Sequence, residues 1–444
     1  MSLFWLIILT FSRSTLQAKK LAASTLEGDE ATGNTPPDSS DSALEDSMEN
    51  IAGHHMVWKY TTVDPDIKFS LVVAREDCES LKAARLEGTL MSLLLALFAY
   101  GLDVCSLCGD GATENVQLFK SLCTETILDW LSNDTKQEFE KLGLLEEAAM
   151  NVVFINPSMG KPIFVVEDMP HVVKRLANAL ELSSKKKEKR DLRFEKNRYP
   201  INLRMLEGVW QALGGGKFHL SECKLGWQHF LKDAYSRMNV SLAVQVLSDT
   251  VVIMITKAQD DPDIKLPMQN FQYDKLKELA RHVNNLVDII NGRSTTKNVF
   301  RADFKAETAE DIQKKLIEIL KWFSDWRALV FSDDNDLTEW NFLSEQTWNG
   351  LKRTILGYVG LLAFYVTTMK FSISPRRTLY DTVENHFAAL RQGEASDGLT
   401  ASKCRSGAVK STSFQMTSNK TGKTNCRGAP GQESRKAFKR QKRF

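Results

Sequence analysis

Cysteine is scarce in this sequence: seven residues are scattered over 444 positions. An odd number of widely spaced cysteines excludes a small disulfide-built scaffold and favours reduced thiols in an intracellular compartment. Cys105 and Cys108 form a C-x-x-C pair, but no second Cys or His pair follows at zinc-ribbon spacing. We therefore interpret this pair as packing residues rather than metal ligands.

Apolar runs are short as well. The run from Leu3 to Leu9 is too short to span a bilayer, and it lacks the basic residues that begin a signal peptide. Gly357 to Met369 is apolar but also short. These patterns predict a soluble intracellular protein without a membrane partner, with a secretory start at residues 3–11 as the alternative.

Charge is distributed unevenly, although the formal net charge is only +2. Leu26 to Asn50 contains no Lys or Arg and is rich in acids and Ser, which predicts a disordered linker. From Ala401 on, twelve basic residues face the single acid Glu433, so this tail carries about +11. Lys185 to Arg190 (KKKEKR) is predicted to be an exposed basic loop.

Strands and helices alternate from about residue 55 to residue 182. The predicted strands are Met56–Thr62, Phe69–Ala74, Val104–Cys108, Val152–Ile155 and Ile163–Val166. Helices are predicted over Glu79–Tyr100, over residues 115–131 and after Asp168, where Pro170 marks a helix start.

From Asn202 to about Lys370 the apolar pattern is almost wholly helical. The predicted helices are Leu203–Leu213, Lys224–Tyr235, Val240–Thr256, Tyr273–Ile290, Ala309–Leu329 and Ser344–Met369, followed by a last helix over Thr378–Gln392. The Trp and Phe residues of this region recur at helical spacing, so we interpret them as core rather than as a ligand cage.

Asp110 stands at the most informative position in the chain. It follows a predicted buried strand, lies between Gly109 and Gly111, and precedes a helix. A carboxylate at the end of a central strand, with glycines that allow close approach, is a common way to present a metal-binding acid. The alternative is an ordinary strand–turn–helix connection, because turns favour Asp and Gly.

The element order predicts an α/β fold: an RNase H-like core that lacks its first strand and is interrupted by a large all-α insertion. Such cores hold two divalent ions between acids from two strands and a late helix, for phosphodiester chemistry. Asp110 and Glu384 would supply two of those acids, and hard carboxylate oxygens suit Mg²⁺.

Five segments, in order, resemble the P-element-type transposases, including relatives with a THAP domain. They are CGDGATENVQLFKSL, PIFVVEDMPHVVKRLANAL, YSRMNVSLAVQVLSDTV, VNNLVDIINGRS and SPRRTLYDTVENHFAALRQ, within residues 55–406. The resemblance implies that Asp110 and Glu384 are catalytic acids and ligands of Mg²⁺ or Mn²⁺. Asp381 would share a helix face with Glu384, and His171 is a further candidate near the metal or DNA.

The same resemblance implies DNA as partner, a possible homo-oligomer and a helical insertion that in some relatives binds GTP. Lys436 to Arg443 (KAFKRQKR) in the basic tail is typical of a nuclear-import signal, which predicts nuclear localisation; the alternative for this tail is a solvated disordered end. Gly214-Gly215-Gly216-Lys217 lacks the spacing of a P-loop, so the sequence itself gives no support for GTP. The corresponding organisation is a stub and linker (1–50), a first core part (51–200), the insertion (201–343), a second core part (344–400) and the basic tail (401–444).

Two departures from the family pattern stand out. No strand with the first catalytic acid is recognisable upstream of Met56, and no cysteine precedes Cys78 to build the zinc module. We therefore expect an N-terminally truncated, degenerate transposase with little activity. The alternative is a non-enzymatic, domesticated transposase body that binds nucleic acid through its basic tail.

Overall fold

The structure is a computed structural model that describes most of the chain between Trp5 and Leu379. The described residues are 5–15, 54–67, 69–78, 82–184, 190–215, 225–230, 239–292, 296–333 and 336–379. The chain divides into two compact units, one of residues 1–11, 59–70 and 81–380, the other of residues 12–58, 71–80 and 381–444. All elements described below from residue 82 onward belong to the first unit.

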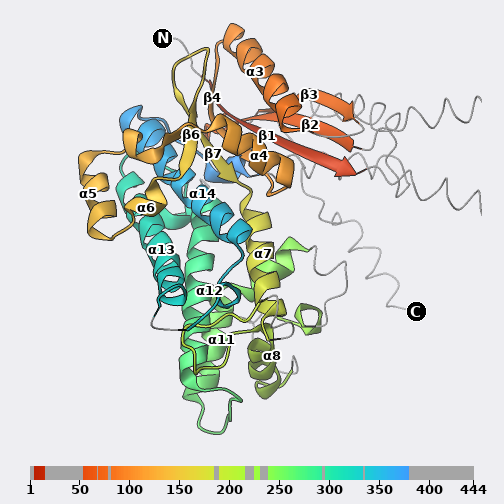
Figure 1. Cartoon of the computed structure of the whole chain (residues 1–444), viewed down its shortest axis with the longest axis vertical. Coiled ribbons are helices and arrows are strands. Elements are labelled where there is room, and N and C mark those ends of the chain that lie inside the picture. Colours follow the sequence, from red (N-terminus) through yellow and green to blue (C-terminus); the bar gives the residue numbers. More distant parts are fainter. Residues whose placement is uncertain are drawn as a thin grey trace, which may run out of the picture. The chain divides into compact units, whose positions relative to one another are not determined.

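The described strands form one seven-stranded mixed sheet (Figure 1). Its order is β3-β2-β1-β4-β7-β6-β5, and β4 pairs in parallel with both β1 and β7, whereas β6 is antiparallel to β7. The strands are β1 (Trp5–Thr15), β2 (His54–Thr62), β3 (Ser70–Cys78), β4 (Leu102–Gly109), β5 (Glu125–Thr126), β6 (Asn151–Ile155) and β7 (Pro162–Glu167).

The prediction that the first strand is missing is wrong. The apolar run that starts the chain forms β1, and its register pairs Ile7 with Val104 and Phe11 with Gly109 of β4. A continuous apolar run suits a strand that is covered on both faces, and its length does not separate such a strand from a short membrane or signal segment. The parallel pairing of this run with β4, about 100 positions later in the chain, identifies it as a strand.

Helices pack against the sheet, and the elements named after β7 are all helical. The helices are α3 (Ala83–Ala99), α4 (Thr113–Leu122), η1 (Ile127–Trp130), α5 (Asn133–Lys141), α6 (Leu145–Ala148), α7 (Met169–Leu182), α8 (Leu203–Ala212), η2 (Trp227–His229), α10 (Val240–Val246), α11 (Asp249–Asp260), α12 (Asn270–Ile290), η3 (Val299–Arg301), α13 (Ala309–Val330), η4 (Glu339–Asn341), α14 (Glu345–Leu361), the π-helical η5 (Leu362–Thr368) and η6 (Pro375–Thr378).

Three helix predictions need correction. Of the helix predicted over Lys224–Tyr235, the structure describes residues 225–230, which contain only the short 3-10 helix η2. The helix predicted over residues 115–131 ends at Leu122, because β5 and η1 follow. The single helix predicted over Val240–Thr256 is two, α10 and α11, separated at Leu247 and Ser248. The stretch Val240–Asp260 is long and apolar enough to cross a membrane by length and composition, and 44% of its most apolar window is buried inside the protein.

Helix α14 lies directly against β7 because two of its glycines remove the side chains that would separate them. A Cβ at Gly357 would lie 2.6 Å from the Val165 carbonyl oxygen, and one at Gly360 would lie 2.4 Å from the Phe164 ring. This contact brings the start of α14 beside the carboxyl ends of β4 and β7.

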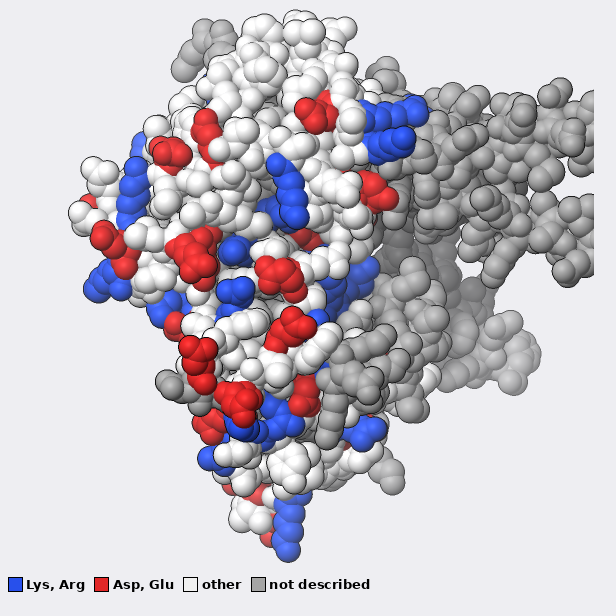
Figure 2. All heavy atoms as spheres, in the orientation of Figure 1, with Lys and Arg blue, Asp and Glu red and all other residues white. Residues whose placement is uncertain are grey.

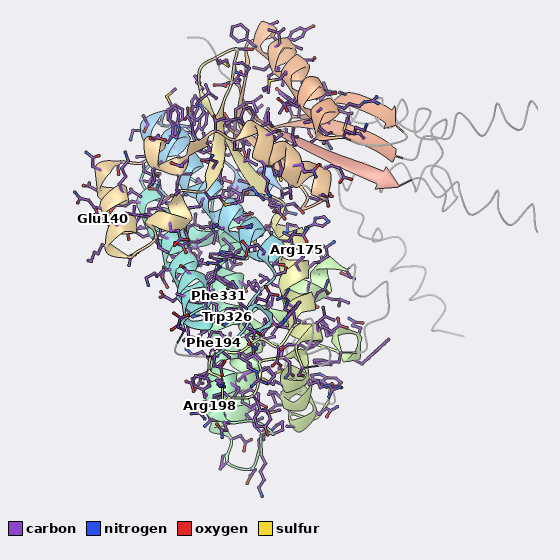
Figure 3. All side chains as sticks on the ribbon, viewed as in Figure 1. Glu140, Arg175, Phe194, Arg198, Trp326 and Phe331 are labelled. Atoms are coloured by element: carbon purple, nitrogen blue, oxygen red, sulfur yellow. The ribbon has the colours of Figure 1, made fainter. Side chains whose placement is uncertain are left out.

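Several aromatic residues of the helical region are core, as predicted, whereas Trp227, Phe331 and Trp340 are exposed. Phe194 and Trp326 lie side by side in Figure 3, with stacked rings 4.5 Å apart, and Trp326 also packs edge-on against Phe342 at 4.9 Å. All three are buried. They join α13 to the segment that follows α7 and to the segment that leads into α14.

Candidate functional site at the carboxyl end of strand β4

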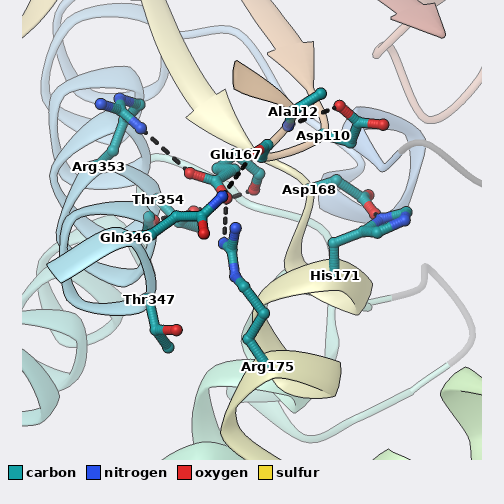
Figure 4. A network of polar contacts seen from close by, with 12 residues as sticks. Asp110, Ala112, Glu167, Asp168, His171, Arg175, Gln346, Thr347, Arg353 and Thr354 are labelled. Atoms are coloured by element: carbon teal, nitrogen blue, oxygen red, sulfur yellow. Dashed lines mark hydrogen bonds and ion pairs between the residues drawn. The ribbon is translucent and has the colours of Figure 1, made fainter. Parts of the chain in front are cut away.

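Asp110 follows the last residue of β4, in the turn that leads into α4, as the sequence predicted. Its Oδ1 accepts hydrogen bonds from the Ala112 amide at 3.0 Å and from Asn115 Nδ2 at 2.7 Å. Asn115 is buried in the first turn of α4. The carboxylate is therefore held in one orientation at the carboxyl end of β4 (Figure 4).

A second acid and a histidine come from the neighbouring strand. Asp168 follows β7, and its amide donates to the Gly109 carbonyl at 2.9 Å, which joins the two strand ends. Its Oδ2 lies 2.6 Å from Nδ1 of His171, on the first turn of α7. Asp110, Asp168 and His171 lie near one another, on the same side of the strand ends, in Figure 4.

The surroundings of His171 raise its pKa. Burial by itself lowers this pKa, but the hydrogen bond and negative charge of Asp168 outweigh it, Lys174 opposes them, and Asp110 adds a further favourable charge. A carboxylate that faces an imidazole favours the imidazolium form. His171 thus lies within the electrostatic reach of Asp110, and its role near a metal or DNA stays a prediction.

We expect His171 to stabilise the fold more at low pH than at high pH. Its pKa is higher in the folded chain than in the unfolded chain, so the stabilisation is complete below the unfolded value of about 6.5. It is lost as pH rises through the folded pKa. Urea unfolding from pH 5.5 to 8.5 should therefore show a gap between the wild type and His171→Gln that narrows with rising pH.

His282 offers a matched control of opposite sign, because burial lowers its pKa. The advantage of the wild type over His282→Gln should widen as pH rises. A gap for His171→Gln that is constant or widens with pH would contradict the assigned ion pair.

Glu167, the last residue of β7, is the centre of a buried ionic network that sequence reasoning missed. Its carboxylate pairs with Arg175 of α7, and its Oε2 accepts from Arg353 Nη1 of α14 at 3.1 Å. Thr354 Oγ1 donates to the Glu167 carbonyl at 3.0 Å. The only sequence signal was an acid that directly follows an apolar strand and precedes Asp168.

The network fills the space between the Asp110 turn and α14. A Cβ at Gly111 would lie 2.4 Å from Glu167 Oε1, and one at Gly350 would lie 2.6 Å from Glu167 Oε2. Gln346 Nε2 also donates to the Gly111 carbonyl at 2.8 Å. The turn that carries Asp110 is thus fixed from behind by residues of β7, α7 and α14 (Figure 4).

Glu384 and Asp381 lie outside the described residues, so their distance from Asp110 stays a prediction. The segment that leads to them is well anchored up to Leu379. Arg377 Nη1 donates to the carbonyls of Thr62 and Asp64, at 2.9 and 2.8 Å. The Ser374 amide donates to Val63 O at 2.7 Å.

The described residues alone do not complete a metal site. Asp110 Oδ1 is engaged by two N–H donors, which leaves Oδ2 as the better placed oxygen for a cation. Within the described ranges, no three His, Cys, Asp or Glu side chains come together as metal ligands would. Of the two acids that the resemblance assigns to Mg²⁺ or Mn²⁺, the described ranges contain Asp110, and coordination by Glu384 stays a prediction.

Comparison with known proteins gives a fold relationship. No protein-family model and no curated protein matches this sequence. Among solved structures, the chain is similar to the Drosophila P element transposase strand transfer complex, with a TM-score of 0.62 and 16% sequence identity. The match covers 90% of this chain and 75% of that one, so the chain has a transposase-like fold.

Proposed function

We propose that this chain is a transposase-derived protein that binds DNA at the carboxyl end of β4 and has lost its strand-cutting activity. The observation that carries the proposal is the position of Asp110: the end of a central parallel strand, in a fold like that of a transposase. The strand order β3-β2-β1-β4-β7 supports an RNase H-like core.

The inferred loss of strand-cutting activity rests on the sequence of β1. Its eleven residues, WLIILTFSRST, contain no Asp and no Glu, although β1 is the parallel neighbour of β4. In the RNase H-like cores that the resemblance implies, the first strand supplies a carboxylate ligand, and bound ions would stabilise the attacking and leaving oxygens of the phosphodiester. Here Asp110 and Glu384 would hold a cation without that ligand, which favours weak metal binding over efficient cutting.

The test is DNA binding with and without Mn²⁺, measured by fluorescence anisotropy of a labelled duplex and the full chain. Mn²⁺ is expected to raise the affinity of the wild type several-fold, because a cation between two carboxylates and a phosphate removes their repulsion. Asp110→Asn and Glu384→Gln should each lose this increase and keep the metal-free binding. Plasmid nicking by the wild type should not exceed that of the two variants.

Glu140→Gln is the matched control, since Glu140 is an exposed acid of α5 (Figure 3). It should behave as the wild type. An Mn²⁺ effect that persists in Asp110→Asn would overturn the assigned site, and nicking that is lost in this variant would overturn the inferred loss of activity. Failure of the wild type to bind DNA at low salt would overturn the proposal as a whole.

The basic tail favours a second candidate, a non-enzymatic nucleic-acid binder. Acidic and basic side chains are interspersed over the described face in Figure 2, whereas twelve basic residues follow Ala401. A variant that ends at Thr400 separates the two. If the tail is the binding element, this variant loses nearly all salt-sensitive binding, including the Mn²⁺-dependent part. GTP binding by residues 201–343, nuclear localisation, oligomeric state and the domain boundaries stay predictions.

A further inference from the structure

A cleft of about 620 Å³ lies between α4 and α14. Its walls come from one face of α4, from residues 149–151 and from the first three turns of α14. Its lining includes Gln117, Lys120, Cys123, Asn151, Asn349 and Arg353. The volume is in the range of sites that hold small molecules, about 300–1,000 Å³.

A buried cation lines the inner end of this cleft. Arg353 is 4% exposed, and its guanidinium shares the Glu167 carboxylate with Arg175. Burial lowers the pKa of Arg353, Glu167 opposes this, and Arg175 adds repulsion. Two guanidinium groups thus share one carboxylate. One of the two positive charges therefore has no counter-charge in this network, although buried charge is normally balanced by one.

Cys123 does not supply that counter-charge. Burial raises the pKa of its thiol to about 12, so the group is neutral near pH 7. The one carboxylate among the lining residues is Glu345, which is exposed, accepts a hydrogen bond from Asn349 and lies 3.9 Å from Arg327. An anion that enters the cleft would therefore meet a positive charge at its inner end.

The remaining lining suits a phosphate group better than a base. The amides of Gln117, Asn151 and Asn349 and the ammonium of Lys120 offer N–H donors. Phe119 is the aromatic residue of the lining, and the Arg353 guanidinium lies 5.5 Å from the centre of its ring. The face of the Phe119 ring that Arg353 covers is thus unavailable for stacking with a base, and stacking is how single-stranded bases are usually held.

The cleft begins beside the candidate site. Gln346, which also lines it, donates to the carbonyl of Gly111, the residue after Asp110. The Gly111–Gln346 contact therefore joins the turn that carries Asp110 to the wall of the cleft.

We propose that the cleft between α4 and α14 binds a backbone phosphate of a nucleic-acid strand, with Arg353 as its buried anion partner and Lys120 at its rim. This inference rests on the proposed function, because it takes the strand to be the one that passes Asp110. Recognition is of the phosphate, so it is independent of base sequence.

Asn349→Asp tests the proposal without removing the buried arginine. The substitution places a carboxylate on the cleft wall and is expected to weaken binding of a labelled duplex at least about tenfold at low salt, by repulsion of the phosphate. Lys120→Ala should reduce the slope of log affinity against log salt by about one. Lys141→Ala removes an exposed charge of α5 away from the cleft and should leave affinity and slope unchanged. Thermal unfolding of each variant verifies that it is folded.

Binding of inorganic pyrophosphate, measured by calorimetry, separates this inference from the proposed function. Pyrophosphate binding by the wild type that is lost in Asn349→Asp supports the anion site even if DNA does not bind. DNA binding by a folded Asn349→Asp that equals the wild type overturns the inference and leaves the proposed function standing. Loss of pyrophosphate binding without any change in DNA affinity would show a site for free phosphate and overturn the nucleic-acid part.

Discussion

Replacing Glu167 with alanine is expected to lower the free energy of unfolding by about 3–5 kcal/mol. Glu167 and Arg353 are 2% and 4% exposed, and the Glu167 carboxylate is bonded to Arg353 and Arg175 at once. Its removal would leave one guanidinium buried without a counter-charge, which costs more than the loss of the bonds themselves. Urea unfolding at pH 7 measures the difference.

The charge, rather than the volume, should account for most of this effect. Glu167→Gln keeps the shape of the side chain and one acceptor oxygen, yet it should still destabilise the fold because it removes the negative charge. Adding Arg353→Met to Glu167→Met should recover part of the loss, since an apolar pair can replace a buried ion pair. Glu140→Ala, at an exposed site, should change stability by less than about 0.5 kcal/mol. A loss below about 1 kcal/mol for Glu167→Ala would show that the network is not a buried structural element.

Asp110 could be predicted from sequence because its signal is local. An apolar strand, a Gly-Asp-Gly turn and an amphipathic helix occupy about twenty consecutive residues, and each has a recognisable pattern. The strands β2, β4, β6 and β7 and the long helices α12 and α13 were predicted on the same basis, with ends that differ by a few residues.

The ionic network behind Asp110 could not be predicted, because its members are far apart in the chain. Arg353 lies 186 positions after Glu167, and it directly follows Lys352 in a helix whose first half also carries Glu345 and Asn349, so its sequence context does not mark it as buried. The glycines of α14 were the available hint: Gly350, Gly357 and Gly360 recur within one helix, and glycines inside a helix indicate close packing against another element.

Strand β1 shows that a chain can lack the first catalytic acid of the family pattern and still contain the strand that would carry it. The family resemblance linked them, because no acid-bearing strand could be recognised upstream of Met56. The structure has the strand and the sequence of that strand has no carboxylate. A chain can therefore keep the sheet geometry that presents Asp110 while it lacks a ligand that cutting requires, which is the basis for proposing binding without efficient catalysis.

Trp326→Ala is expected to destabilise the protein by about 3–5 kcal/mol, the usual cost of removing a buried Trp side chain. Trp326 is 2% exposed, stacks on Phe194, packs edge-on against Phe342, and donates from Nε1 to the Arg193 carbonyl at 2.8 Å. The substitution would open a cavity at the junction of three segments and leave that carbonyl without its donor.

The nearby Trp340 provides the control for this last prediction. It is 40% exposed, and its main described ring contact is the Arg190 guanidinium at 5.9 Å, so Trp340→Ala should cost less than about 1 kcal/mol. Because the Trp326 cluster joins α13 to the segment before α14, its loss should lower the stability of the helical region and of the sheet together, in a single unfolding transition. Two separate transitions, with only the helical signal shifted, would show that the cluster stabilises the helices alone, and that the position of α14 against β7 depends on its glycine contacts.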